Sequence, residues 1–124
     1  MLLRTIFLIH GGKNMGYSIN DKTKTISLVR GDTLRVQIGI DVDGQAYTPT
    51  NGDTIRFAMK SSYGSNRVLI HKEIPKDTMV LTLLPNDTKR LAFGNYVYDI
   101  EITFENGDVD TFISGYLKLL PEVE

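Results

Sequence analysis

Histidine and acidic side chains are the residues of this sequence best suited to acid–base or metal chemistry, and few of them are spaced for it. The chain has two histidines, His10 and His71, and no cysteine. They do not form a His-x-x-x-His pair, and neither a Ser, His and Asp set nor a glycine-rich phosphate loop can be assembled around them. His71 falls in an alternating segment, where a structural histidine is the simpler interpretation. We therefore expect no enzymatic activity, no metal site and no cofactor.

Two groups of acidic residues allow a weaker interpretation as cation sites. The run Asp41–Gly44 resembles the start of a calcium loop, but the later ligands and the closing glutamate are missing, so a hairpin turn explains it better. Asp99 and Glu101 alternate along one segment and are expected to share a face with Asp110. Such a face would suit a hard cation or a Lys or Arg of a partner, while a solvated sheet face is the plainer alternative.

The elements that position these residues are predicted to be short β-strands. Apolar and polar residues alternate with period two between Gly, Asn, Asp and Pro signals. About seven strands are expected, with at most one helical turn near residues 85–91. This pattern predicts an all-β fold, an antiparallel sandwich of immunoglobulin-like type. The expected strands are 25–29, 34–41, 55–60, 68–74, 78–84, 96–104 and 109–119.

Length and composition fit one folded domain. A chain of 124 residues can bury about two-thirds of its surface without disulfides or metals. Hydrophobic residues make up 41% and charged residues 23%, as in ordinary globular proteins. Fourteen basic residues against fifteen acidic ones give a net charge of -1, which disfavours a nucleic-acid partner. The absence of cysteine fits folding in a reducing cytosol.

The first fourteen residues allow two interpretations, whereas residues 15–124 are expected to form the sandwich domain. The apolar run 5–9 is far below the roughly 20 residues that span a bilayer, and no signal-peptide cleavage site follows it, so we expect neither membrane insertion nor secretion. Gly11–Met15 can be encoded as GGA GGA AAA AAT ATG, a ribosome-binding sequence before a start codon. Met15 is then the native start. The alternative is that residues 2–9 form an additional edge strand.

The strongest hairpin signal is Asn106–Gly107, which is typical of a two-residue type I′ turn. Pairing outward from this turn places Ile100 opposite Ile113 on the core face. It places Glu101 opposite Phe112 on the other face. Phe112 is therefore an apolar residue on a side that is nominally exposed to solvent.

Two surface features are candidates for binding. Val97, Phe112 and Tyr116 are expected to form an outward apolar patch beside Asp99 and Glu101, which is typical of a protein–protein interface. Burial of this patch by another part of the chain is the alternative. In addition, the aromatic side chain of Tyr63 lies in a Ser, Gly and Asn loop and is the best candidate for contact with a ligand such as a sugar.

Several short runs between about residues 24 and 120 carry a family resemblance. They are Arg30-Gly31-Asp32-Thr33, Asp43-Gly44, Ile55-Arg56-Phe57-Ala58-Met59-Lys60, Leu81-Thr82-Leu83-Leu84-Pro85, and Phe93-Gly94-Asn95-Tyr96 leading to Ile102-Thr103-Phe104-Glu105-Asn106-Gly107. In this order they resemble a small immunoglobulin-like domain of phages and prophages of Gram-positive bacteria. That domain is similar to the N-terminal domain of phage baseplate upper proteins.

The resemblance implies a non-enzymatic virion component of a baseplate, tail or capsid. Such a protein is made in the cytoplasm of the bacterial host and docks onto a phage structural protein in the virion, and self-association is an open alternative. No nucleic acid or membrane is expected as a partner. Two other functions stay open, a phage-encoded inhibitor of a host enzyme or defence protein, and a carbohydrate-binding module that uses Tyr63.

Overall fold

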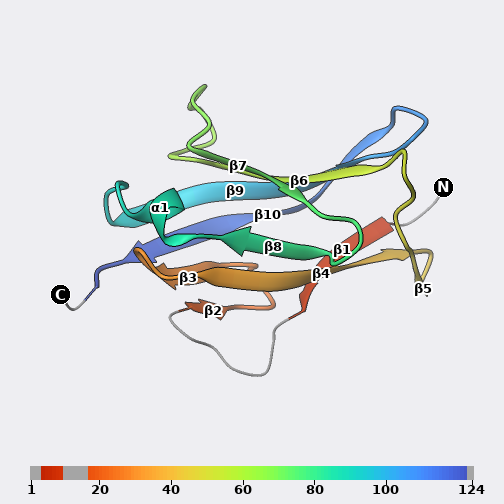
Figure 1. Ribbon diagram of the computed structural model, residues 1–124. Helices are drawn as coiled ribbons and strands as arrows, with labels where there is room; N and C mark the ends of the chain where they lie inside the picture. The colour runs from red at the N-terminus through yellow and green to blue at the C-terminus, as the bar shows by residue number, and fades with distance from the viewer. Residues whose placement is uncertain (1–3, 10–16, 123–124) are drawn as a thin grey trace.

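Ten β-strands and one short helix make up the part of the chain that this computed structural model describes, residues 4–9 and 17–122, without the side chains of residues 4–9 and 112 (Figure 1). The all-β class is confirmed, and the single helical turn lies within the expected region. The strands number ten rather than about seven. Two of the three additional strands have only three and two residues, too few to show alternation, and the third, Arg4–Ile9, falls in the segment 2–9 for which an additional edge strand was the alternative. The elements are β1 (Arg4–Ile9), β2 (Tyr17–Ile19), β3 (Ile26–Val29), β4 (Leu34–Val42), β5 (Gln45–Ala46), β6 (Thr54–Lys60), β7 (Ile70–Ile74), β8 (Val80–Leu83), α1 (Pro85–Thr88), β9 (Gly94–Thr103) and β10 (Val109–Leu120).

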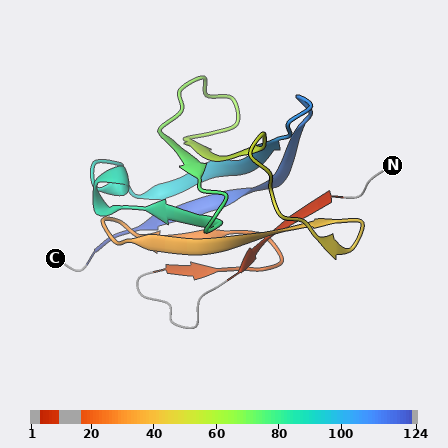
Figure 2. The same ribbon diagram turned by 45° about the vertical axis from the view of Figure 1, so that its right-hand side comes forward.

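The strands form two sheets. One has six strands in the order β2-β3-β10-β9-β6-β7, and in the other β4 pairs with β1, β5 and β8. Among the described strands every pairing is antiparallel except that of β3 with β10. Figure 2 shows the segment between β5 and β6 crossing from the smaller sheet to the larger one. The chain therefore changes sheet at this connection.

The two sheets enclose one hydrophobic core. In β4 the alternating residues Leu34, Val36, Ile38 and Ile40 are buried, and the residues between them are more exposed. β6 shows the same pattern, and β9 shows it from Tyr98 onward. These strands contribute Phe57 and Tyr98, whose rings stack with centroids 5.5 Å apart. Each large apolar side chain buried in this way contributes about 1.5–3 kcal/mol relative to exposure. The alternation seen in the sequence thus becomes the packing of both sheets.

The turn between β9 and β10 differs from the predicted type I′ turn. The Gly107 amide donates to the Phe104 carbonyl at 2.9 Å, and the Phe104 amide donates to the Asp108 carbonyl at 2.8 Å. Gly107 has a positive φ of 95°, whereas Asn106 is not among the described residues with positive φ. A type I′ turn needs positive φ at both central positions. The connection is instead a three-residue loop that ends in a left-handed glycine.

This longer loop shifts the first part of the hairpin register by one residue. Asp110 lies opposite Ile102, where Thr111 was predicted. An irregularity between Thr111 and Ile113 then compensates, so that Ile113 lies opposite Ile100 as predicted. Asp110 consequently pairs with a core-facing residue and does not lie on the face of the two β9 carboxylates, which corrects the expected acidic group.

Gly115 lies opposite Tyr98 in the regular pairing of β10 with β9. A Cβ at Gly115 would lie 2.7 Å from the Lys24 carbonyl oxygen, so only glycine allows this approach. The same carbonyl accepts a hydrogen bond of 2.5 Å from the Tyr98 hydroxyl. The segment that precedes β3 therefore packs directly on β10.

Gly115→Ala is expected to lower the free energy of unfolding by about 1–3 kcal/mol, because backbone rather than a flexible side chain would have to move. Urea unfolding measures this loss. Gly64→Ala is the matched control, since a Cβ at Gly64 meets no atom within 4 Å, and we expect it to change stability by less than about 0.5 kcal/mol. Equal stability of the two variants would contradict the close approach at Gly115.

Arg30 joins the end of β10 to the loop before β9. Its guanidinium forms an ion pair of 2.7 Å with Glu122, donates to the Leu91 carbonyl at 3.1 Å and lies 4.0 Å from the centre of the Phe93 ring. The hydrogen bond from Arg30 is the main cause that lowers the pKa of Glu122. Arg30 belongs to the run Arg30–Thr33 that carries the resemblance, and its guanidinium is thus engaged in contacts within the fold.

Candidate docking face

The outward side of the six-stranded sheet, called here the outer face, carries most of the predicted site residues. Because side chains alternate along each strand, the pairing registers align the outward positions of neighbouring strands in rows across the sheet. The rows are Ser18–Ser27–Lys118–Asn95, Tyr116–Val97–Lys60, Ser114–Asp99–Ala58–His71 and Thr111–Glu101–Arg56–Glu73.

The apolar part of the outer face is smaller than expected. Tyr116 lies directly opposite Val97 and is 51% exposed, whereas Val97 is only 6% exposed. Val97 therefore cannot provide a broad contact surface, which corrects its expected exposure. The side chain of Phe112 lies outside the described residues, and its backbone falls at the irregularity of β10. Tyr116 is thus the accessible apolar group among the described side chains of this predicted patch.

The two carboxylates of β9 lie beside this apolar part. Glu101 forms an ion pair with Arg56 of β6, and Asp99 lies opposite Ala58 of the same strand. Ala58 has a small side chain, and the cavity at this point measures about 260 Å³. The lining residues are Arg56, Ala58, Val68, His71, Asp99 and Glu101.

Sequence analysis did not assign Arg56 or His71 to this site. Arg56 reaches the site because β6 pairs with β9, and His71 reaches it because β7 pairs with β6 on the other side. No local pattern marks such long-range partners, and an alternating strand looks the same whichever strand it pairs with. An exposed ion pair of this kind is worth about 0–1 kcal/mol, so Arg56 and Glu101 contribute more to the charge pattern of the face than to stability.

Metal ligation finds no geometric support in residues 17–122. No three His, Asp or Glu side chains in the described part of the chain lie close enough together to hold a metal ion. Asp99 and Glu101 are brought together, but Asp110 is not. Because Glu101 forms an ion pair with Arg56, these side chains can offer hydrogen bonds and ion pairs to a partner.

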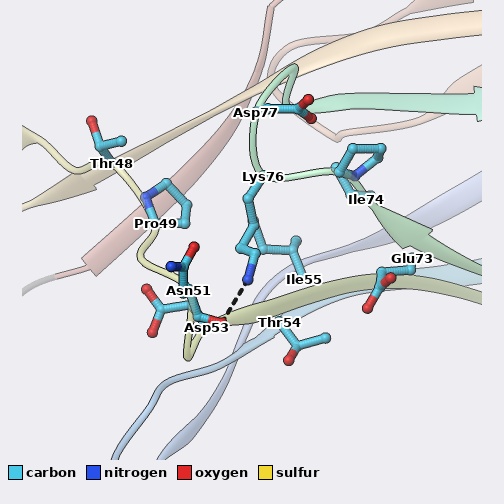
Figure 3. Close-up of a pocket in the computed structure, with 11 residues that line it drawn as sticks. Thr48, Pro49, Asn51, Asp53, Thr54, Ile55, Glu73, Ile74, Lys76 and Asp77 are labelled. Carbon is cyan, nitrogen blue, oxygen red and sulfur yellow. Dashed lines mark hydrogen bonds between the residues drawn. The ribbon is translucent and has the colours of Figure 1, made fainter.

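A larger cavity of about 570 Å³ lies at the connection between the two sheets (Figure 3). Lys76 extends across it, and its ammonium group donates to the Asn51 carbonyl at 2.8 Å. Glu73 and Asp77 also line this cavity. Lys76 thus joins the turn after β7 to the segment before β6, which is a structural contact.

Asp53 is a buried carboxylate in the wall of this cavity. Burial alone would raise its pKa, but hydrogen bonds from the Tyr47 hydroxyl and from the backbone of Thr50 and Glu105 outweigh burial and lower the pKa below its ordinary value. Both carboxylate oxygens accept bonds from these donors. The carboxylate is consequently ionised and held in place, which suits a structural role rather than acid–base chemistry.

Tyr63 is 61% exposed in the loop between β6 and β7, which projects from the sheet in Figure 1. Neither cavity described above includes it. Burial is the main cause that raises the pKa of the Tyr98 hydroxyl, and the electrostatic interaction with Tyr63 raises it further. A ligand contact at Tyr63 stays a prediction.

No protein-family model matches this chain, and no curated protein was found to be similar to it. Within residues 4–9 and 17–122, no helix has the length and apolar character needed to cross a bilayer. We therefore infer function from the outer face and from the resemblance described above.

Proposed function

We propose that this protein is a non-enzymatic docking subunit of a phage or prophage particle, associated with the baseplate, tail or capsid. The resemblance supports both the particle and an immunoglobulin-like sandwich, and the two sheets around one core agree with such a fold. The docking role is carried by one observation, the half-exposed Tyr116 ring on the outer face beside Asp99 and the ion pair of Glu101 with Arg56.

The chemistry of the outer face favours a folded protein as partner. Tyrosine provides a large apolar contact together with a hydroxyl, and such residues dominate the energetics of many interfaces. Asp99 and the pair of Glu101 with Arg56 supply polar contacts that fix the orientation of the partner. Since the strands at the centre of this sheet are paired on both sides, recognition occurs through side chains. The partner is a phage structural protein. A second copy of the chain is the alternative partner, which the tests would reveal.

Tyr116→Asp is expected to reduce incorporation into particles by at least about tenfold, because a buried unpaired charge in an interface costs more than 1.4 kcal/mol. Quantitative peptide mass spectrometry on washed, induced particles would measure copies of the chain relative to the major capsid protein. Tyr63→Asp is the matched control, a charge placed on an exposed tyrosine elsewhere, and it should leave the copy number unchanged. Both variants must show wild-type unfolding curves.

Two results would overturn the proposal. The first is Tyr116→Asp protein present at the wild-type copy number, which excludes Tyr116 from the contact. The second is wild-type protein that is abundant in the induced lysate and absent from washed particles, which would favour the inhibitor. Wild-type particles with a fixed copy number would support the docking subunit.

A further inference from the structure

A separate groove of about 560 Å³ lies on the outer face over β2, β3 and β10. Polar groups dominate its lining, which includes Ser18, Asn20, Thr23, Thr25, Ser27 and Lys118. None of its lining residues is acidic. The groove therefore favours a ligand with hydroxyl groups and a negative charge and disfavours a metal cation.

The strand register explains why these groups converge. Lys118 lies opposite Ser27, and Ser27 lies opposite Ser18, so an ammonium and two hydroxyls form one row across three strands. None of these three side chains forms a hydrogen bond or ion pair with another side chain or backbone group in the described ranges. Their donors and acceptors are consequently available to a ligand.

An aromatic ring lies beside the groove. Tyr116 precedes Lys118 by two positions on the same face of β10 and is half exposed. Its neighbour Leu117 pairs with Ile26, which places Thr25 next to Tyr116 in the parallel register. An exposed ring beside a row of hydroxyls provides a stacking surface for the C–H face of a sugar together with partners for its hydroxyls.

We propose that this groove binds an anionic saccharide, a sugar that carries a carboxylate or a phosphate. The hydroxyls of Ser18, Thr25 and Ser27 hydrogen-bond the sugar, and Lys118 forms an ion pair with the anionic group. Tyr116 stacks on the ring. A peptide could add as a strand only at β2, the end strand of this sheet, because β3 and β10 are each paired on both sides, and such backbone pairing would not use the row of hydroxyls and Lys118. Nucleic acid would require more cations than a single lysine.

Titration of the isolated full chain tests this site. The probes are glucuronate, glucose 6-phosphate, glucose and inorganic phosphate, and the signals are the backbone amide resonances of residues 18–27 and 118. We expect at least one anionic sugar to bind about tenfold more tightly than glucose, a difference of 1.4 kcal/mol. Comparison of glucuronate with glucose 6-phosphate distinguishes the carboxylate from the phosphate.

Lys118→Gln is expected to reduce the affinity for the anionic sugar to that for glucose. Lys60→Gln is the matched control, because Lys60 lies on the same face outside the groove, in the row of Tyr116 and Val97. The proposal is wrong if no sugar shifts these resonances, if Lys118→Gln binds like the wild type, or if inorganic phosphate binds as tightly as the best sugar. Because the isolated protein is used, the result is independent of the particle assay.

Discussion

Asp53→Ala is expected to lower the free energy of unfolding by about 3–5 kcal/mol, because it removes the charged acceptor of three partly buried hydrogen bonds. The side chain of Asp53 is 2% exposed. It accepts bonds from the Tyr47 hydroxyl at 2.5 Å, the Thr50 amide at 2.9 Å and the Glu105 amide at 3.0 Å. One carboxylate therefore joins the segment between β5 and β6 to the turn of the β9–β10 hairpin.

Urea unfolding of the wild-type protein and of Asp53→Ala measures this loss. Asp77→Ala removes an exposed carboxylate whose described hydrogen bond is to its neighbour Thr78, and we expect it to cost less than about 0.5 kcal/mol. Tyr47→Phe, which removes one donor and leaves the carboxylate, should fall between the two. A cost for Asp53→Ala no larger than that for Asp77→Ala would show that the three bonds do not hold the connection.

The lowered pKa of Asp53 also sets the direction of the pH dependence. A carboxylate whose pKa is lower in the folded state stabilises the protein above its unfolded pKa, near 3.9, and loses this contribution as pH falls through the folded pKa. Wild-type protein should therefore lose stability below about pH 4 more steeply than Asp53→Asn. Unfolding curves between pH 2 and 7 compare the two, and parallel profiles would contradict the assignment. The lowered pKa of Glu122 acts in both proteins and cancels.

Phe57→Ala is expected to cost about 3–5 kcal/mol, the range for removal of a large aromatic side chain from a packed core. Phe57 is fully buried in β6 and stacks on Tyr98 with an interplanar angle of 27°. Its removal leaves a cavity that the neighbouring strands of both sheets cannot fill without moving. This loss approaches the total stability of many single domains.

The comparison for Phe57 is Phe93→Ala, at an aromatic residue that is half exposed and contacts Arg30 from outside the core. An exposed cation–π contact contributes about 0.5–1 kcal/mol, so Phe93→Ala should be several times milder. Thermal and urea unfolding both report the difference. Similar losses for the two variants would mean that Phe57 does not occupy the packed centre between the sheets.

Strand positions could be predicted because each strand faces the core with one side. The expected strand 34–41 matches β4 (Leu34–Val42), and the expected strand 55–60 matches β6 (Thr54–Lys60). Pairing partners could not be predicted in the same way. The parallel pairing of β3 with β10 joins segments far apart in the chain, and alternation is identical for every choice of partner. The hairpin register failed for a different reason, since Asn-Gly fits more than one turn geometry.

The candidate site shows the same limit. Period-two alternation was sufficient to place Asp99 and Glu101 on one face, and Tyr116 lies on that face as well. The exposed fraction of Val97 depends on its cross-strand neighbours and was overestimated. Arg56 joins the site only because β6 pairs with β9. Residues recruited across strands are invisible to a pattern that runs along one strand.

The position of β10 within its sheet has a consequence for biosynthesis. β10 lies between β3 and β9, yet β3 leaves the ribosome about 90 residues earlier than the β10 segment with which it pairs. Until then, β2 and β3 have no connection to β9, β6 and β7 within this sheet. The nascent chain therefore exposes unpaired strand edges until β10 has been made, and chaperones that shield such edges would act before that point.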